Sequence, residues 1–468
     1  MFELSRASST PLVDQIVEQL AARVQDGRLA PGTRLPSIRG LAQQLRASPY
    51  TVVDAYDRLV ARGLIASRTG RGFFVSNPQP GGPQVVAVEA LPDPASDAVA
   101  LAQAAMSGWG HVVAAGCGVL PESWLQELSP GTILARLTRS RRSQLWAPCP
   151  AHGLTELREQ LATKLQHQGI GAGVDHILTT LGASQAFDLV CRVLLSPGDT
   201  VLVEDPGYFV LFEQLRAHHL NLIPVPRLGD GPDLEALEAA CQAHRPRAYF
   251  VQTLLHNPTG SNLTPVKTHR ILSLAEQYGF SVVEDDVYGD LHEGPAVRLA
   301  QVDGFRHVIY TSSFTKTLGP SLRVGYVAAD PRLVTRLMQR KLLSVLTAPT
   351  LSELFVTEVL TAGRYRRYVD QVRTRLARMR RDGHAALVRA GIQFDEAAAD
   401  GLFLWGRVPA GVATEALVRQ ARERSILLAR GSLFSPAGGC TDRLRFNAAH
   451  STHPELTRFL SETLPRAA

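Results

Sequence analysis

Apolar residues recur at helical spacing through the first part of the chain. The first repeat places an apolar residue at every fourth position and comprises Leu12, Ile16, Leu20 and Val24. This spacing puts the four side chains on one face of a helix, which the glycines and proline at 27–32 would end. A second repeat follows Ser37, a residue type that caps helices. It predicts a short helix that turns Ile38, Leu41 and Leu45 inward.

A tight turn and a third helix come next. Ser48 is a cap residue and Pro49 suits a first helical position, so a helix is predicted up to Gly63, with Val53, Tyr56 and Val60 or their immediate neighbours buried. The stretch LIASRTGRGFFV then reads as two short strands around a glycine-rich turn with basic flanks. Three helices and a basic hairpin predict a winged helix-turn-helix domain over residues 1–77, whose last helix would enter the major groove of DNA.

The pattern changes after this module. Residues 77–97 are rich in proline and glycine and have no repeat, so a linker is expected at 78–100. Beyond it, helical stretches alternate with the β-branched runs HILTT, TVLVED, RAYFVQT, SVVEDDVY, HVIYTSS and VGYVAA. This alternation predicts an α/β domain over residues 101–468 with a mostly parallel central sheet. Its large part would span about 131–330 and its smaller C-terminal part about 331–468.

Charge and cysteine content narrow the function classes. Ten arginines and six acidic residues lie in residues 1–77, so this sixth of the chain holds most of the net charge of +6, as expected of a surface that meets the DNA backbone. The five cysteines are odd in number and far apart, which argues against a disulfide framework or a zinc site. In addition, no apolar run reaches membrane-spanning length. From the cysteine pattern and this absence together, we expect a cytoplasmic protein without a bound metal.

Lysine is rare. Among the 49 basic residues only Lys164, Lys267, Lys316 and Lys341 are lysines, and arginine cannot form a Schiff base. Lys316 follows an apolar strand and stands between hydroxyl residues and a glycine-proline turn, where burial would favour a neutral, nucleophilic amine. The patterns around the other three lysines predict solvated surface positions.

Several groups of polar residues near predicted strand ends suit one cofactor. Ligands of α/β sheets bind beyond the carboxyl ends of strands. Ala183 and Ser184 lie between a strand and a helix, where backbone amides bind anions. The hydroxyls of Ser313 and Thr315 and the guanidinium of Arg323 flank Lys316 and would complete a phosphate site.

The remaining groups would hold an aromatic ring. Asp285 can pair with a protonated ring nitrogen, Tyr288 and Asn257 can hydrogen-bond a phenolic oxygen, and Tyr208 offers a stacking face. Together with an amine for an aldehyde and a site for a phosphate, this set fits pyridoxal 5′-phosphate (PLP). A metal-binding cluster is the alternative for the acids around Asp285, but no histidine pattern accompanies them.

The stretch from about Thr10 to Val75 resembles the GntR family of bacterial regulators. The matching pieces are PLVDQI, GRLAPGTRLPSIRGLA, SPYTVVDAYDRLVARGLI and SRTGRGFFV. The resemblance implies contacts with double-stranded DNA from the start of the second helix, from the recognition helix and from the wing. The residues are Arg34, Ser37 and Arg39; Ser48, Tyr50 and Thr51; and Arg68, Arg71 and Gly72. Dimerisation or protein docking by this module is the alternative.

Residues of about 120–460 resemble fold-type I aminotransferases. The ordered motifs are GASQAFDL, PGDTVLVEDPGYF, HNPTG, VVEDDVYGDL, SSFTK, LRVGY and LRFN. The resemblance implies that Arg445 takes a substrate α-carboxylate, with a structural salt bridge as the alternative. Two positions depart from the family. Pro148 stands where a tyrosine usually reaches the partner subunit's phosphate, with Trp146 the nearest aromatic residue. Arg430 replaces a proline and is a candidate for altered substrate selection.

Both halves together resemble the MocR subgroup of GntR regulators, in which an aminotransferase-like domain is the sensor. The resemblance implies a homodimeric, PLP-dependent transcriptional regulator that senses PLP or an amino compound through an aldimine at Lys316. The alternative is a working aminotransferase that acts on an amino acid, with Lys316, Asp285 and Tyr288 as its catalytic residues. A GntR sensor without PLP is a third hypothesis.

Overall fold

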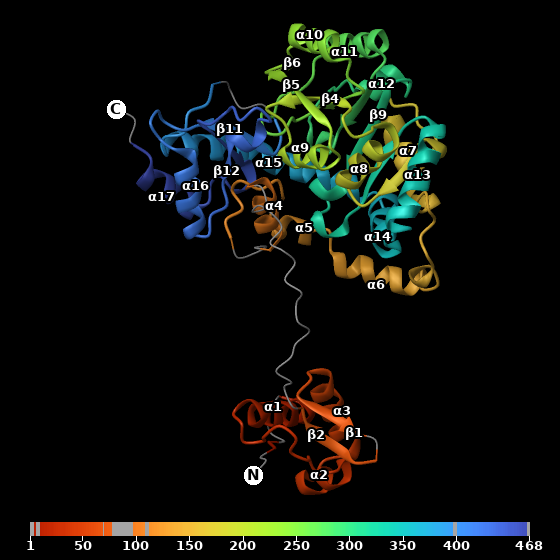
Figure 1. Ribbon diagram of the computed structural model, residues 1–468, viewed down its shortest axis with the longest axis vertical. Helices are drawn as coiled ribbons and strands as arrows, with labels where there is room; N and C mark the ends of the chain where they lie inside the picture. The colour runs from red at the N-terminus through yellow and green to blue at the C-terminus, as the bar shows by residue number, and fades with distance from the viewer. Residues whose placement is uncertain are drawn as a thin grey trace. The chain divides into compact units, whose positions relative to one another are not determined.

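The computed structural model describes residues 4–5, 10–68, 70–76, 97–107, 112–395 and 400–465. The chain divides into two compact units, residues 1–93 and 94–468. Most of the predicted linker, residues 78–96, lies outside the described residues. The ribbon in Figure 1 follows each unit by colour.

Three helices and a hairpin form the first unit, in the order predicted. They are α1 (Leu12–Gln25), α2 (Ile38–Leu45), α3 (Pro49–Ala61), β1 (Ile65–Arg68) and β2 (Gly72–Val75). Both predicted caps are confirmed. Ser37 Oγ accepts a hydrogen bond from the backbone amide of Gly40 at 3.1 Å, and Ser48 Oγ accepts one from the amide of Thr51 at 3.1 Å. These bonds satisfy amide groups that a helix start leaves without a partner.

The buried face of α3 consists of Tyr56 and immediate neighbours of Val53, Tyr56 and Val60, as the prediction allows. Tyr56 is buried as expected, but Val60 is 38% exposed, and the core side chains around Tyr56 are Val52, Ala55 and Leu59. Val52, Tyr56 and Leu59 are spaced by four and three residues, which is the spacing of a single helix face. Their packing against Ile16 and Leu20 of α1 makes the core of this unit.

The hairpin gains a third chain segment. β1 and β2 pair antiparallel from Ile65↔Val75 to Arg68↔Gly72. The segment before α2 lies along the other edge of β2, where the amide of Leu35 donates to the carbonyl of Phe73 at 2.8 Å and the amide of Val75 donates to the carbonyl of Thr33 at 2.9 Å. The residue range 32–35 therefore joins the wing to the start of α2.

The second unit is built on an eight-stranded sheet with the strand order β3-β10-β9-β8-β7-β4-β5-β6. The strands are β3 (Ile177–Thr180), β4 (Thr200–Asp205), β5 (Asn221–Leu228), β6 (Gly231–Pro232), β7 (Ala248–Gln252), β8 (Ser281–Asp285), β9 (Val308–Ser313) and β10 (Gly325–Ala328). β5, β4, β7, β8 and β9 run parallel, whereas β10 is antiparallel to both β3 and β9. All six predicted runs are strands, so the mostly parallel sheet is confirmed.

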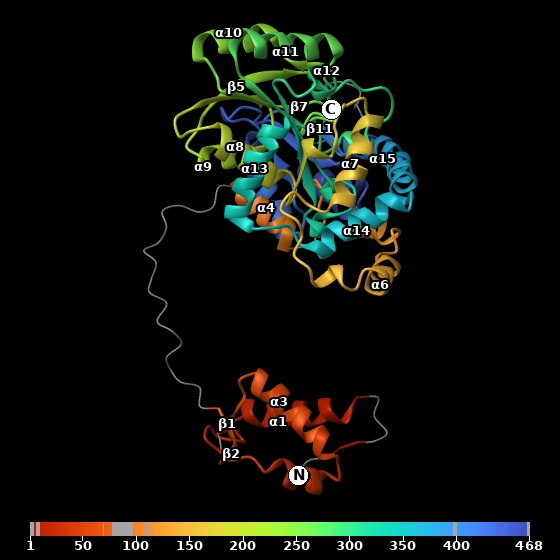
Figure 2. The same ribbon diagram turned by 90° about the vertical axis from the view of Figure 1, so that its right-hand side faces the viewer.

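Helices cover both faces of this sheet. These helices are α6 (Pro130–Ser140), α7 (Thr155–His167), α8 (Ala183–Leu194), α9 (Phe209–Ala217), α10 (Leu234–His244), α11 (Pro265–Tyr278), α12 (Leu299–Asp303), α13 (Pro331–Val345) and α14 (Thr350–Thr361). Consecutive strand residues face opposite cores. Leu202 and Val282 lie in one apolar cluster and Val203 and Val283 in the other. Figure 2 shows α10 and α11 side by side near β5.

β5 is a strand that the sequence pattern did not predict. It contains Pro224 and Pro226, which lack an amide hydrogen and are therefore confined to sheet edges and bulges. β5 lies near one edge of the sheet, between β4 and the two-residue β6. On the side of β6 the two prolines have little partner strand to bond with. The amide hydrogens that they lack are therefore not needed there, and a strand with two prolines can form at this position.

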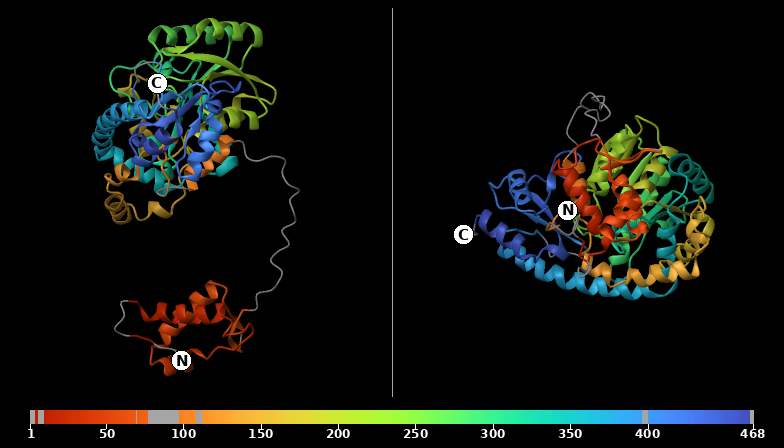
Figure 3. Two further views of the ribbon diagram at one scale, coloured as in Figure 1. Left: turned by 90° about the vertical axis from the view of Figure 1, so that its left-hand side faces the viewer. Right: turned by 90° about the horizontal axis from the view of Figure 1, so that it is seen from below.

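The C-terminal part has its own small sheet, with the order β11-β13-β12. Its elements are α15 (Arg364–Arg389), β11 (Phe403–Arg407), α16 (Thr414–Glu423), β12 (Ala429–Arg430), β13 (Arg443–Asn447) and α17 (Pro454–Thr463). The long α15 runs from the large part to this small sheet (Figure 3). The remaining helices, α4 (Asp97–Ser107) and α5 (Glu122–Gln126), precede the large part in the chain.

Candidate functional site

A cavity of about 140 Å³ lies beside the carboxyl ends of β7, β8 and β9. The structure brings together in its lining every residue that the sequence predicts to hold PLP. These residues are Ala183, Ser184, Tyr208, Asn257, Asp285, Tyr288, Ser313, Thr315, Lys316 and Arg323. The other lining residues are Met106, Val119, Phe187, Gln252, Val287 and Pro320. We call this cavity the PLP pocket.

Lys316 reaches the PLP pocket from the end of β9. Its Nζ donates a hydrogen bond to the carbonyl oxygen of Gly118 at 3.0 Å. Burial lowers the pKa of the Lys316 amine to about 8, and the nearby Arg445 guanidinium contributes to the lowering, whereas Asp285 opposes this shift. A cationic neighbour and loss of water both favour the neutral amine, so a larger share of Nζ is neutral near pH 7 than in an ordinary lysine.

The expectation that the other three lysines are solvated is wrong. Lys341 is fully buried and its Nζ donates to the carbonyl of Ala151 at 2.9 Å. Lys267 pairs with Asp230 at 2.6 Å, and the largely buried Lys164 pairs with Asp290 at 2.7 Å. Helical patterning shows which face of a helix is apolar but not which neighbours cover the polar face. None of the three lines the PLP pocket, so Lys316 is the only lysine among its described lining residues.

Asp285 ends β8 as a buried carboxyl group. Burial raises its pKa to about 7, and the adjacent Asp286 raises it as well, although a hydrogen bond from the backbone amide of Val287 opposes the shift. Among the described residues no lysine or arginine forms an ion pair with it. A buried carboxyl group without a cation in contact is suited to pair with the protonated nitrogen of a pyridine ring.

Gln252 connects two of the predicted cofactor contacts and was missed in the sequence. Its Oε1 accepts a hydrogen bond from the backbone amide of Asn257 at 2.6 Å, and its Nε2 lies 3.4 Å from Asp285 Oδ2. Gln252 is the last residue of β7, so a polar residue at the carboxyl end of an apolar strand was the signal that could have found it. It fixes the position of Asn257 relative to Asp285.

Arg445 lies behind Asn257 rather than in the PLP pocket. Its guanidinium donates to Asn257 Oδ1 at 2.7 Å and to the carbonyl of Gly116, and it stacks over the Phe403 ring at 4.3 Å. Arg445 is 3% exposed, and its Nε has no hydrogen-bond partner in the described part of the chain. Both acceptors are neutral, so Arg445 forms no salt bridge with a carboxylate among the described residues. Its contact with a substrate carboxylate stays a prediction.

The phosphate end of the pocket is formed at the start of α8. Gly182 precedes the helix with a φ of 79°, and a Cβ atom there would lie 2.8 Å from the guanidinium of Arg323. Only glycine therefore lets Arg323 lie against the first turn, where it donates to the carbonyl of Leu181 at 2.7 Å. The Ser313 and Thr315 hydroxyls are 2.7 Å apart. Helix-start amides, two hydroxyls and a guanidinium match the needs of a phosphate group.

The predicted DNA contacts all have accessible side chains or backbone in the first unit. Tyr50, at the start of α3, is 87% exposed. Arg39, Arg68, Arg71 and Gly72 are exposed as well. Arg34, also exposed, pairs with Phe74 and so lies beside the wing. The remaining three residues, Ser37, Ser48 and Thr51, lie at the starts of α2 and α3. The arrangement leaves a helix start and a basic wing open to a ligand.

Arg430, the candidate for altered substrate selection, does not line the PLP pocket. It forms an ion pair with Glu415 at 3.1 Å in a different cavity. Trp146, near Pro148, is 86% exposed. The described residues contain no group of histidine, cysteine and acidic side chains that could hold a metal ion. Within the same described ranges, no helix is long and apolar enough to cross a membrane.

This sheet and pocket define the second unit as an aminotransferase-type, PLP-binding fold. The model of the family "Aminotransferase class I and II" matches residues 129–462, and that of "Bacterial regulatory proteins, gntR family" matches residues 12–75. The chain belongs to the aminotransferase class I and II family and carries a GntR-type DNA-binding domain at its N-terminal end. The family implies PLP as the cofactor, and the residues of the pocket fit it.

Relatives of two kinds are found. The HTH-type transcriptional regulator YdcR of Escherichia coli (strain K12) is 29% identical over 445 residues, which cover 93% of this chain and 94% of that protein. The 2-aminoadipate transaminase of Thermus thermophilus is 33% identical over 328 residues, 67% of this chain and 80% of the transaminase. The first match includes both domains and fits a MocR-type regulator, in which the GntR domain implies DNA binding.

Solved structures support the fold of the second unit. The α-aminoadipate aminotransferase LysN of T. thermophilus, complexed with N-(5′-phosphopyridoxyl)-L-leucine, has a TM-score of 0.68 at 28% identity and covers 79% of this chain and 96% of its own. A kynurenine aminotransferase of Pyrococcus horikoshii has a TM-score of 0.72 at 22% identity, with 81% and 96% covered. The fold is therefore that of a fold-type I aminotransferase.

Proposed function

We propose that this protein is a PLP-dependent transcriptional regulator whose second unit senses PLP or an amino compound through covalent attachment at Lys316. The observation that carries the proposal is that the side chains predicted to hold PLP line one pocket around a buried lysine, in a chain that also carries a GntR domain at residues 12–75. When bound, PLP supplies an aldehyde that a primary amine can attack and a ring that withdraws electrons.

Each side chain of the pocket has a task in holding this cofactor. Asp285 would keep the ring nitrogen protonated, and the hydroxyl of Tyr288 and the amide of Asn257 would hydrogen-bond the phenolic oxygen. Tyr208 would stack on the ring. Arg445, whose Nε has no partner in the described residues, would bind the carboxylate of an amino compound.

The contact between Lys316 and Gly118 offers a path for a signal. Attachment of the cofactor replaces hydrogens of Nζ and therefore competes with the hydrogen bond to the Gly118 carbonyl. Asn447 Nδ2 holds the same segment through the carbonyls of Cys117 and Val119, both at 2.7 Å. Ligand states that differ in these bonds would favour different positions of residues 112–119, which is the differential binding that any switch requires.

We also propose that a second copy of this chain covers an exposed apolar patch. The dimer patch consists of Trp146, Leu343, Leu346 and Leu351, which are 86%, 80%, 69% and 46% exposed. Leu343 lies near the end of α13, Leu346 follows this helix, and Leu351 lies at the start of α14, which contacts the short helix Gln144–Trp146. Large apolar side chains exposed near one another are typical of interaction sites, and regulators that read paired DNA half-sites are symmetric dimers.

The experiment that tests the proposed function compares turnover with DNA binding. The PLP-loaded protein would be assayed with 2-oxoglutarate and a panel of amino acids, and its affinity for the DNA upstream of its own gene would be measured with and without each amino acid. We expect DNA affinity to change with an amino compound in the absence of sustained turnover. Sustained turnover without any change in DNA affinity would instead support an aminotransferase, the function named for the T. thermophilus relative.

The rate of PLP attachment to cofactor-free protein should follow the ionisation of Lys316. The lowered pKa of about 8 means that the amine is mostly protonated, and therefore unreactive, below this pH and mostly neutral above it. The rate should rise with pH and level off above about pH 8, whereas an ordinary lysine would level off near about pH 10.4. Stopped-flow absorbance measures this profile. A rate that still rises tenfold per pH unit above about pH 9 would contradict it.

An Arg71→Ala variant should weaken DNA binding about fivefold on all sequences alike, because a wing arginine would contact phosphates rather than bases. The slope of log affinity against log salt concentration should fall by about one. Fluorescence anisotropy over a salt series measures both quantities. Arg28→Ala, which removes an exposed arginine outside the wing and the two DNA-facing helices, is the control. Equal effects of the two substitutions would argue against a contact by the wing.

A further inference from the structure

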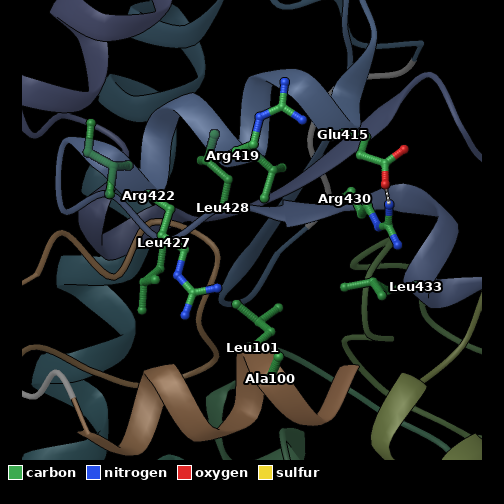
Figure 4. A pocket seen from close by; sticks show the side chains of 11 residues that line it. Ala100, Leu101, Glu415, Arg419, Arg422, Leu427, Leu428, Arg430 and Leu433 are labelled. Carbon is green, nitrogen blue, oxygen red and sulfur yellow. Dashed lines mark ion pairs between the residues drawn. The ribbon is translucent and has the colours of Figure 1, made fainter. Parts of the chain in front are cut away.

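A second cavity lies in the same unit and shares no residue with the PLP pocket. Its volume is about 250 Å³. α4 forms one wall and α16, with the residues that follow it, forms the other (Figure 4). Nothing in the proposed function uses this cavity, although it contains Arg430, one of the positions at which the chain departs from its family's pattern.

The cavity has an apolar floor. Leu427 and Leu428, buried at 7% and 2% exposure, belong to its lining, Leu101 points into it from α4, and Leu433 closes one end. Open space lined by leucine side chains favours a hydrocarbon or an aromatic group, because transfer of such a group out of water is favourable.

Charged groups stand on opposite sides of this floor. Arg430 is paired with Glu415 on one side. The guanidinium of Arg422 points into the cavity from the other side (Figure 4) and has no hydrogen-bond or ion-pair partner among the residues that the structure describes. Arg419, although it belongs to the lining, points away from α4. One unpaired guanidinium of the described chain therefore faces an apolar space.

We propose that this cavity is a second ligand site, which takes a small carboxylate with an apolar body. A planar guanidinium binds a carboxylate through paired hydrogen bonds, and the leucines would cover the hydrocarbon part of the ligand. The volume lies just below the range usual for drug-sized molecules, which limits the ligand to a small metabolite. The ligand needs no amino group, since none of the described lining residues is a lysine.

The walls of the second cavity are bonded to the elements that form the PLP site. The amide of Leu427 donates to the carbonyl of Val113 at 3.0 Å, and the amide of Gly116 donates to the carbonyl of Leu427. Two residues after Leu427, Ala429 of β12 pairs with Arg445 of β13 in the small antiparallel sheet. A ligand bound against Leu427 and Leu428 would thus contact a stretch of chain that lies next to two parts of the PLP site. These parts are the strand that carries Arg445 and the segment that ends at Gly118.

The test is isothermal titration calorimetry of the PLP-loaded, full-length protein with 4-phenylbutyrate. The uncharged 4-phenylbutanol serves as the control ligand with the same body. We expect Arg422→Gln to weaken binding of the carboxylate at least about tenfold, the size of one charge-assisted hydrogen bond. Arg381→Gln removes an exposed arginine of α15 outside the cavity and should leave binding unchanged. The alcohol should bind wild-type protein at least about tenfold more weakly than the carboxylate.

A second variant removes space instead of charge. Leu101 points from α4 into the cavity (Figure 4), and Leu101→Trp should fill it and abolish binding while Arg422 stays in place. Thermal unfolding of each variant shows whether the fold is retained. If wild-type protein does not bind 4-phenylbutyrate, or if Arg422→Gln and Leu101→Trp both bind it with wild-type affinity, the proposal is overturned. Unchanged binding in both variants would place the carboxylate elsewhere, for example at Arg445.

Discussion

A Lys316→Ala variant is expected to fold and to lose the absorbance of covalently bound PLP completely. Lys316 is the only lysine in the described lining of the PLP pocket, and the other three lysines hold Asp290, Asp230 or the carbonyl of Ala151 at other places. The fold should persist because Nζ of Lys316 makes one hydrogen bond, to Gly118, and no ion pair within the described chain. Absorbance spectroscopy after addition of PLP and removal of the excess measures the effect.

Lys267→Ala is the matched control for this variant. It also removes a largely buried lysine, but one whose partner Asp230 is itself half exposed, so its fold and its PLP absorbance should both be retained. The response of DNA binding to an amino compound should disappear in Lys316→Ala and persist in Lys267→Ala. Retention of the PLP absorbance in Lys316→Ala would show that another nucleophile carries the cofactor.

A Leu346→Asp variant is expected to convert the dimer to a monomer and to lower operator affinity at least about a hundredfold. Leu346 is 69% exposed at the end of α13, in the middle of the dimer patch. An unpaired carboxylate in an apolar interface costs several kcal/mol, so association should fail at micromolar concentration. A monomer holds one half-site instead of two and loses the gain in effective concentration. Analytical ultracentrifugation and gel-shift titration measure the two effects.

Val266→Asp provides the control for the dimer patch. Val266 is 75% exposed on α11, so the substitution adds the same charge to a similarly exposed apolar position outside the patch. It should leave both the assembly and the DNA affinity unchanged. A Leu346→Asp protein that remains dimeric would place the interface on another surface, and the patch would need a different partner.

The composition of the PLP pocket could be predicted because of sheet topology. Asn257 follows β7, Asp285 ends β8, and Ser313 and Lys316 lie at or just after the end of β9. These strands run parallel, so their carboxyl ends meet at one edge of the sheet. Residues far apart in the sequence thereby converge whenever each of them follows its own strand. The helix start at Ala183 could be identified for a related reason, since it comes directly after β3.

Other parts of the site depend on contacts that no local pattern encodes. Gly118 accepts from Lys316 across 198 positions of the chain, and Arg445 reaches Asn257 from 188 positions away. The burial of Lys341 likewise depends on the loop at Ala151, which covers the polar face of α13. Apolar periodicity reports the face that an element buries, whereas these contacts are set by how neighbouring elements meet.

Attachment of PLP to Lys316 can be read directly from the masses of peptides after borohydride reduction of the PLP-treated protein. Reduction fixes the bond between the cofactor and the lysine that carries it, and the four lysines fall on separate stretches of the chain. We expect a phosphopyridoxyl group on Lys316 and on none of the other three. An unlabelled Lys316, or a label on Lys164, Lys267 or Lys341 in its place, would contradict this expectation.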